Sequence, residues 1–165
     1  MTLRDLQPKD APGILSWMKD PTVNCFFRFS GDAVTLQSVE AFIEKAKDKE
    51  KDLHLAIVDE DDTYMGTISL KEIDAQAKNA EYAISTCPHV HGKGVAFDAT
   101  REILRIAFED LHLHRVYLNV LEENERANHF YRKCGFVYEG QFRDHVHIRG
   151  ELKNINWYSM LDSEF

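Results

Sequence analysis

HGKGVA, residues 91–96, joins an alternating apolar run at residues 81–85 to a long amphipathic segment that opens at Gly94. This order predicts a strand, a glycine loop and the start of a helix. Glycines let the backbone turn sharply and approach a ligand closely, and the first N–H groups of the helix are left free to bind it. Phosphate oxygens suit such a loop. The same pattern also occurs as a plain strand-to-helix connection, so the flanking sequence is needed to separate the two interpretations.

The segment after the loop predicts a helix from Gly94 to about Leu111. Its apolar residues recur at spacings of three and four, so they share one face; they are Ala96, Ala99, Ile103, Ala107 and Leu111. A strand is predicted at residues 115–120 and a short helix at residues 124–134. Gly135 ends that helix, and a further strand begins at Phe136.

Two motifs together resemble the GNAT superfamily of acetyl-CoA-dependent N-acetyltransferases. The pyrophosphate loop of that family follows Gln/Arg-x-x-Gly-x-Gly/Ala, which here falls on His91, Gly94 and Ala96, so a histidine stands at the Gln/Arg position. The second family signature is matched by residues 124–136, NERANHFYRKCGF, at the usual separation from the first. The similarity covers most of the chain. It is closest to the ribosomal-protein alanine acetyltransferases and to spermidine N-acetyltransferase, whose C-terminal tails also resemble this one.

The resemblance implies an α+β acyl-CoA N-acyltransferase (GNAT) fold, with a mixed central sheet of about seven strands flanked by about four helices. The remaining sequence agrees with this fold. It predicts a helix at residues 11–19 capped by Asp10, a second helix at 37–49, and strands at 2–6, 53–58, 64–73, 81–85, 136–148 and 152–161. At 165 residues the chain has the size of one domain, so we expect a single N-acetyltransferase domain over residues 1–165.

The charge balance disfavours two classes of partner. The chain has 20 basic and 28 acidic residues and a formal net charge of −8, which argues against binding to nucleic acid and to anionic membranes. No apolar run approaches the roughly 20 residues that span a bilayer, and the N-terminus lacks a signal-peptide core. The 3 cysteines are widely spaced and suit reduced thiols. We therefore expect a cytoplasmic protein.

The chemistry that the resemblance implies is direct transfer of an acetyl group to an amine in a ternary complex. The amine must lose a proton, because alkylamines have a pKa of about 10, and the departing thiolate benefits from a proton donor. Tyr131 is the candidate general acid, although a tyrosine there is also compatible with a half-buried core aromatic. Glu72 and Glu81 match acidic positions of spermidine acetyltransferase and are the candidate bases or anchors of a base water. A lone glutamate on a strand is more commonly a surface residue.

Acetyl-CoA is the co-substrate that the resemblance implies. The strand at Ile84, Ser85 and Thr86 would bind the pantetheine arm through its backbone. His91 is either a pyrophosphate ligand or a plain loop histidine, and Asn124 is a candidate ligand that can also cap its helix. The candidate coenzyme-binding residues are Ile84, Ser85, Thr86, His91, Gly92, Lys93, Gly94, Val95, Ala96, Asn124, Ala127 and Tyr131.

The acceptor is expected to be a small-molecule or peptide amine that binds near residues 17–29, between the first two helices. Phe27 and Arg28 from this region, with Glu72, are the candidate substrate-binding residues, although the aromatic residues also suit fastening of the loop to the sheet. Spermidine acetyltransferase has a glutamate where Arg28 falls. An arginine would repel a polyamine and would bind phosphate or carboxylate with its planar fork. Amino sugar nucleotides, amino acids, polyamines and protein N-termini stay open as acceptors.

The main alternative is a non-catalytic acyl-CoA-binding regulatory module, in which Tyr131 and the strand carboxylates would be dispensable. A dinucleotide site is disfavoured because Phe97 occupies the third glycine position of Gly-x-Gly-x-x-Gly. The His-Val-His pairs at residues 89–91 and 145–147 lack further ligands at suitable spacing, so no metal site is predicted. Cys134 is interpreted as a buried thiol rather than an acyl carrier. A homodimer stays open.

Overall fold

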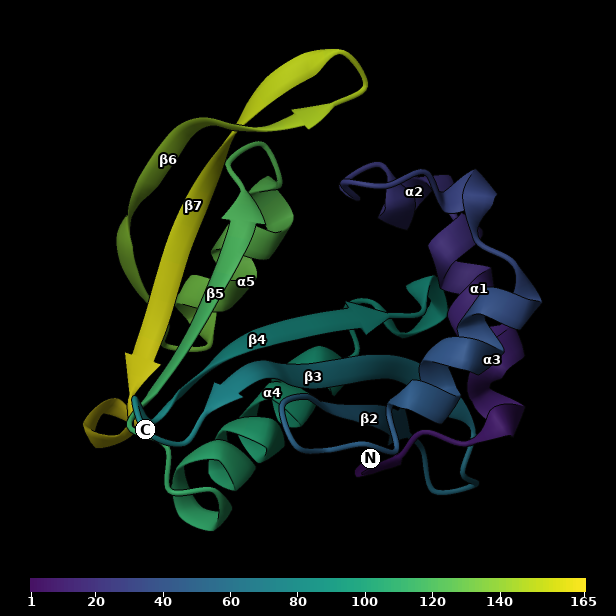
Figure 1. Cartoon of the computed structure of the whole chain (residues 1–165), viewed down its shortest axis with the longest axis horizontal. Helices are drawn as coiled ribbons and strands as arrows, with labels where there is room; N and C mark the ends of the chain where they lie inside the picture. Colours follow the sequence, from purple (N-terminus) through teal and green to yellow (C-terminus); the bar gives the residue numbers. More distant parts are fainter.

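The computed structural model describes residues 1–165 and contains one seven-stranded sheet, in the order β1-β2-β3-β4-β5-β7-β6 (Figure 1). The strands are β1 (Thr2–Asp5), β2 (Leu53–Val58), β3 (Tyr64–Asp74), β4 (Asn79–Thr86), β5 (Arg115–Leu121), β6 (Val137–Ile148) and β7 (Glu151–Leu161). The helices are α1 (Ala11–Lys19), α2 (Pro21–Asn24), α3 (Leu36–Lys45), α4 (Val95–Arg105) and α5 (Glu125–Lys133). The expected mixed sheet flanked by helices is confirmed. None of the helices is long and apolar enough to cross a membrane.

The pairing of β4 with β5 is the only parallel one in the sheet, and it is short. It joins Asn79, Ala80 and Glu81 of β4 to residues 115–117 of β5. Beyond these pairs the two strands separate, and Figure 1 shows them as the arms of a wedge. The sheet therefore opens in its middle, between the ends of β4 and β5.

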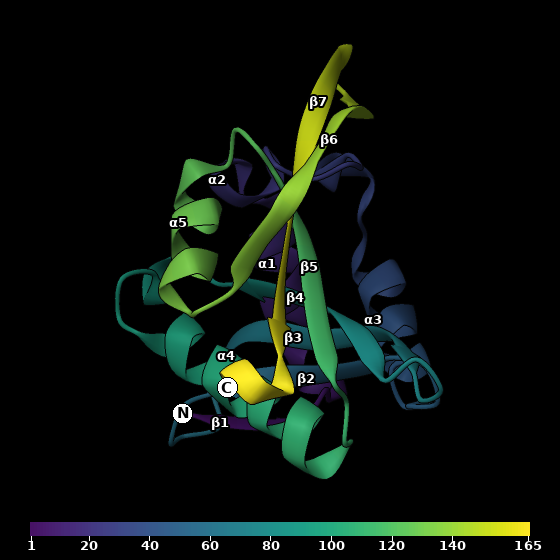
Figure 2. The same ribbon diagram turned by 90° about the vertical axis from the view of Figure 1, so that its left-hand side faces the viewer.

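Separate apolar cores cover the two faces of the sheet. On one face Ile103 and Leu104 of α4 belong to a core of 20 buried residues that includes Leu70 of β3. On the other face Ile14 of α1 and Ile43 of α3 pack in a smaller core of 10 buried residues. Figure 2 shows α4 and α5 on one side of the sheet and α3 on the other. Alternate residues of β2, β3 and β4 thus face different helices, as expected for half-buried strands.

A buried asparagine fixes α5 to the sheet. Asn128 donates to the carbonyl oxygen of Leu121 at 2.9 Å, and its own oxygen accepts from Asn156 at 2.9 Å and from Tyr158 at 2.8 Å. All these polar groups are satisfied although Asn128 is only 6% exposed. The orientation of α5 relative to β5 and β7 is therefore set by directional bonds as well as by apolar contact.

Most predicted elements are confirmed within a few residues, and the strand over residues 53–58 is confirmed at both ends. The helix expected to reach Leu111 is regular only to Arg105, and a π-helical segment, Ile106–Asp110, completes it. The helix predicted at 37–49 begins one residue earlier and ends at Lys45. The four-residue α2 was not predicted.

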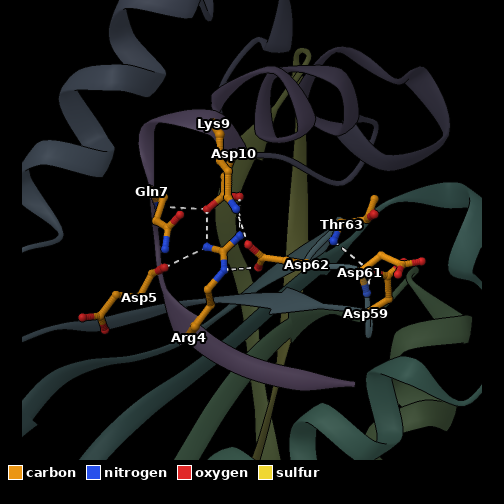
Figure 3. Close-up of polar contacts among 9 residues, drawn as sticks. All are labelled: Arg4, Asp5, Gln7, Lys9, Asp10, Asp59, Asp61, Asp62 and Thr63. Atoms are coloured by element: carbon orange, nitrogen blue, oxygen red, sulfur yellow. Dashed lines mark hydrogen bonds and ion pairs between the residues drawn. The ribbon is translucent and has the colours of Figure 1, made fainter.

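The predicted capping role of Asp10 is wrong in part. Asp10 occupies the N-cap position of α1, but its side chain accepts no hydrogen bond from that helix. Both carboxylate oxygens instead bind the Arg4 guanidinium, at 2.8 and 2.9 Å, and one also accepts from the backbone N–H of Gln7 (Figure 3). Asp62 pairs with Arg4 and Lys9. Asp10 is buried, so its charge requires such a partner.

Candidate active site

The opening between β4 and β5 holds a cavity of about 350 Å³, here called the coenzyme cavity. It is lined by residues from β4, β5, the loop after β4, α5 and the segment that contains α2. The predicted coenzyme-binding residues among them are Ile84, Ser85, Thr86, His91, Ala96, Asn124, Ala127 and Tyr131, and the predicted acceptor residues are Phe27 and Arg28. Gly92, Lys93, Gly94 and Val95 connect two lining residues, His91 and Ala96, without lining the cavity themselves.

The glycines of the loop are required by backbone conformation. Gly92 and Gly94 have φ angles of +77° and +81°, which residues with a Cβ rarely adopt. A Cβ built on either one would meet no atom within 4 Å, so packing does not exclude a side chain there. Gly94 is also the N-cap residue of α4. The first N–H groups of α4 lack intrahelical partners and are available to an anion beside the loop.

His91 links the loop to α5. Its Nε2 lies 3.3 Å from the Thr86 carbonyl oxygen, and its Nδ1 lies 3.1 Å from Nη1 of Arg126. Burial lowers the pKa of His91, and the charge of Arg126 lowers it further. A neutral ring with the proton on Nε2 satisfies both contacts, because Nε2 then donates to Thr86 and Nδ1 accepts from Arg126. Arg126 also lines the cavity and was not predicted.

Tyr131 lies on α5 at the inner wall of the coenzyme cavity. Its ring centroid lies 5.9 Å from that of Tyr82, 6.1 Å from that of Phe136 and 6.3 Å from that of Tyr158. Burial raises the pKa of Tyr131 well above its usual value. The hydroxyl is therefore protonated at neutral pH.

A second cavity of about 560 Å³, here called the acceptor cavity, lies on the opposite face of the sheet against α1 and α3. It shares three lining residues with the coenzyme cavity: Phe27, Ile84 and Ser85. Its other walls are mostly apolar and aromatic, from Ile14, Trp17, Met18, Phe29, Val34, Val39, Phe42 and Ala83. No carboxylate lines it, and its ionisable residues are Lys71 and His54.

His54 is the most distinctive polar residue of the acceptor cavity, and sequence reasoning did not identify it. Its Nδ1 lies 2.7 Å from Oγ of Ser69, which also lines the cavity, and its Nε2 lies 3.9 Å from Oδ2 of Asp52. The ring packs edge-on against Phe42, with the centroids 4.9 Å apart. Burial lowers the pKa of His54 below its usual 6.5. A histidine in an otherwise apolar strand was the available sequence signal, but it did not reveal the cavity.

The two predicted carboxylates line neither cavity. Glu81 accepts from Nδ2 of Asn119 at 3.1 Å and lies 3.3 Å from Nζ of Lys71. Arg28 in turn donates to Oδ1 of Asn119 at 2.8 Å, so a polar chain connects Arg28 to Lys71 through Glu81. Glu72 is exposed, with a φ of +52° at an irregularity of β3. The structure thus brings Glu81 to the edge of the site and leaves Glu72 outside it.

Comparisons with known proteins agree on one family. The sequence profile described as "Acetyltransferase (GNAT) domain" matches residues 1–137. Spermidine N(1)-acetyltransferase of Vibrio cholerae is 27% identical over all of this chain and 95% of its own length. The Escherichia coli K12 protein of the same name is 35% identical over 70% of this chain and 64% of its own. The putative ribosomal N-acetyltransferase YdaF of Bacillus subtilis is 31% identical over 64% of this chain and 57% of its own.

A solved structure extends this similarity to three dimensions. The crystal structure of spermidine N-acetyltransferase from Vibrio cholerae in complex with CoA and spermine matches with a TM-score of 0.90 at 27% identity. The match covers 99% of this chain and 96% of the other. The expected acyltransferase fold is confirmed by this likeness.

Proposed function

Since the chain belongs to the GNAT family of acetyltransferases, we propose that it moves the acetyl group of acetyl-CoA directly to a primary amine while both substrates are bound. The family and the relatives support an N-acetyltransferase that uses acetyl-CoA, and they do not support a non-catalytic coenzyme-binding module. The observation that carries direct transfer is that the two cavities meet at Ile84 and Ser85. An amine on one face of the sheet can therefore reach an acyl group on the other.

The residues of the coenzyme cavity fit acetyl-CoA. The loop with Gly92 and Gly94 offers free N–H groups to the pyrophosphate, and Arg126 adds a positive charge that His91 positions. Lys93 belongs to the same loop, and Val95 is the first residue of α4. Beyond Glu81 the edge of β4 has no β5 partner, so backbone groups at residues 84–86 can bind the pantetheine amides. Asn124 caps α5 by accepting from the N–H of Ala127 at 3.2 Å, which orients the helix beside the cavity.

The reaction joins the amine nitrogen to the acetyl carbon and breaks the carbon–sulfur bond. One proton leaves the amine and one is needed by the thiolate. Tyr131 is the proposed donor to the sulfur, because it lines the coenzyme cavity and a tyrosine hydroxyl is protonated at neutral pH. Direct transfer requires no acyl-enzyme, so the cysteines take no part in this route.

His54 is the proposed proton acceptor, with Ser69 as the hydrogen-bonded intermediary. Its lowered pKa keeps the imidazole neutral at neutral pH, and a ring with the proton on Nε2 leaves Nδ1 free to take the Ser69 proton. Ser69 then takes the proton of the amine. Glu81 remains the candidate anchor of a base water, since Asn119 and Lys71 connect it to both cavities. Glu72, exposed and outside both cavities, is the weaker of the two predicted carboxylates.

The acceptor proposed first is an amine on a neutral or anionic body, such as an amino sugar. Aromatic walls suit the apolar face of a sugar, and a cavity lined by Lys71 with no carboxylate does not suit a second cationic group. A polyamine is the second candidate, because relatives named spermidine acetyltransferases match most of the chain and the net charge is −8. A protein N-terminus has support from the name of the Bacillus relative alone.

Two measurements test this function. A screen of amino sugars, amino acids, polyamines and peptides for thiol release from acetyl-CoA should find one efficient acceptor class. Initial rates with that acceptor should give intersecting double-reciprocal lines, as a ternary complex requires. Parallel lines with a trapped acyl-enzyme would contradict direct transfer. Efficient use of spermidine together with no activity on amino sugars would reverse the order of the two acceptor candidates.

A further inference from the structure

A third cavity of about 490 Å³ lies beside the other two, and none of the roles given above uses it. It is bounded by residues 19–32 and by the tip of the hairpin that β6 and β7 form. Figure 1 shows this hairpin extending past the sheet on the side where α2 lies. The cavity shares Phe27 with both neighbours, Arg28 with the coenzyme cavity and Phe29 with the acceptor cavity. A ligand could therefore occupy it and the acceptor cavity at once.

The third cavity is positively charged, whereas the chain as a whole is negatively charged. Lys19, Arg28 and Arg149 line it, together with His147, against the single carboxylate of Asp32. None of the three cations forms an ion pair with a carboxylate. The chain as a whole has 28 acidic and 20 basic residues, so this is a local concentration of uncompensated positive charge. Such a hollow attracts anions.

Arg149 is fixed at the cavity by contacts distant in sequence. It lies with Gly150 in the hairpin turn, where both residues have positive φ angles of +49° and +82°. Its Nη1 donates to the carbonyl oxygen of Cys25 at 2.7 Å and its Nη2 to that of Asn24 at 3.2 Å. A guanidinium has more N–H donors than these two bonds use, so donors remain for a ligand. The same is true of Arg28, whose Nη2 is bound to Asn119.

We propose that the third cavity binds a phosphate or diphosphate ester carried by the acceptor, while the acceptor's amine reaches Ser85 through the acceptor cavity. This inference rests on the proposed function and specifies its substrate class: a phosphorylated amine, such as an amino sugar linked to a nucleoside diphosphate. Two guanidinium groups and an ammonium group suit the oxygens of a phosphate better than a lone carboxylate. The coenzyme's pyrophosphate has its own ligands at the loop and at Arg126, so these cations are left for the acceptor.

The kinetic test uses amines that share one sugar and differ in phosphate. Glucosamine, glucosamine 6-phosphate and uridine diphosphate glucosamine are compared for kcat/KM in the parent and in a Lys19→Gln, Arg28→Gln double variant. Glutamine at position 28 keeps a donor for Asn119. The parent should prefer a phosphorylated amine by about tenfold or more, and the double variant should lose most of that preference. Lys47→Gln, which removes an exposed charge just after α3, should behave as the parent.

The outcomes of this test show whether the third cavity binds the phosphate of the acceptor or that of acetyl-CoA. A rise in the KM for acetyl-CoA in the double variant, with the preference among amines unchanged, would assign the cavity to the coenzyme and overturn the proposal. An equal preference in parent and variant would overturn it as well. Arg149→Lys should weaken the preference while keeping the charge, since an ammonium lacks the planar fork.

A binding measurement tests the cavity without any catalysis. Calorimetry of inorganic pyrophosphate into protein already saturated with CoA should detect one site, and the double variant should bind about tenfold or more weakly. Absence of binding to the CoA-saturated parent would overturn the proposal. Because this binding is measured without catalysis and with the coenzyme site filled, its result is distinguishable from a failure of acetyl transfer, which would count against the proposed function.

Discussion

His54 and Ser69 are direct cross-strand partners in the β2–β3 pair, and the imidazole Nδ1 lies 2.7 Å from the serine Oγ. Because the partners of an antiparallel pair point to the same face, both side chains enter the acceptor cavity. The other ring nitrogen approaches Asp52, whose side chain is 41% exposed. A proton taken from the amine can therefore leave through Ser69, His54 and Asp52 to solvent.

We predict that His54→Gln lowers kcat on the order of 10²-fold, with a smaller effect on acetyl-CoA affinity, because it removes a general base. The parent should lose kcat/KM as the pH falls through the lowered pKa of His54, and the variant should lack this acidic limb. Steady-state pH profiles measure both effects. His129→Gln, on the exposed surface of α5, is the control. An unchanged acidic limb in His54→Gln would assign the proton to another group, with Glu81 the next to test.

The same histidine should make folding stability depend on pH. Burial lowers its pKa in the folded state, so the unfolded chain binds the proton more readily. Its stabilising contribution is present above about pH 6.5 and is lost as the pH falls through the lower folded pKa. Urea unfolding between about pH 7 and pH 5 should show a larger loss of unfolding free energy in the parent than in His54→Gln. Equal losses would mean that His54 titrates normally.

Tyr131→Phe should lower kcat by about 10²-fold or more and leave acetyl-CoA affinity nearly unchanged, because the hydroxyl acts mainly in the transition state. Rapid-mixing kinetics and calorimetry with CoA separate the two quantities. Tyr138→Phe is the matched control, since that ring is 47% exposed on β6. Equal turnover in Tyr131→Phe and the parent would leave the tyrosine with a packing role only.

Gly94→Val should abolish or strongly weaken acetyl-CoA binding. A β-branched residue at a φ of +81° carries strain of about 1–3 kcal/mol, which the loop can relieve only by changing the conformation that presents its N–H groups. Calorimetry on a variant shown to be folded by circular dichroism is the measurement. Gly150→Val is a matched control, because Gly150 has a φ of +82° outside the coenzyme cavity and should leave coenzyme affinity intact. Unchanged affinity in Gly94→Val would remove the loop from the coenzyme site.

Arg28→Glu should weaken use of an anionic amine several-fold and improve use of spermidine, because a reversed charge changes the sign of its interaction with the substrate. Arg28 is exposed, so solvent screening limits the effect. Arg28→Gln keeps the bond to Asn119 and isolates the charge from the packing. Comparison of kcat/KM for both amines in the three proteins provides the measurement. Efficient acetylation of spermidine by the parent would contradict the role given to this arginine.

Local patterns predicted the parts of the fold that depend on neighbours in sequence. Residues 53–58 are apolar except for His54 and contain no glycine or proline, so their strand was placed at both ends. Gly94 marked the start of α4, because glycine readily adopts the positive φ angle that the N-cap residue of this helix has. The π-helical segment after Arg105 escaped prediction, since its residues continue the apolar spacing while the backbone changes its bonding.

Sequence motifs predicted the parts of the candidate site that are local, and they missed the parts that are assembled from distant segments. Tyr131 and His91 lie in motifs, whereas the pairing of His54 with Ser69 depends on the register of a hairpin. Glu72 was expected on the acceptor side because it matches an acidic position of spermidine acetyltransferase, but it lies exposed at an irregularity of β3 and lines neither cavity. The bond between Arg149 and Asn24 spans 125 positions and has no signature in sequence.

The short ladder between β4 and β5 leaves the β4 backbone groups that point toward β5 beyond Glu81 without a strand to bond. A coenzyme whose pantetheine arm lies there acts as a substitute strand and closes the gap in the ladder. Those amide hydrogens should exchange with solvent quickly in the free protein and slowly once CoA binds. Substrate binding would then be a late step of folding, in which a small molecule finishes the sheet that the chain leaves incomplete.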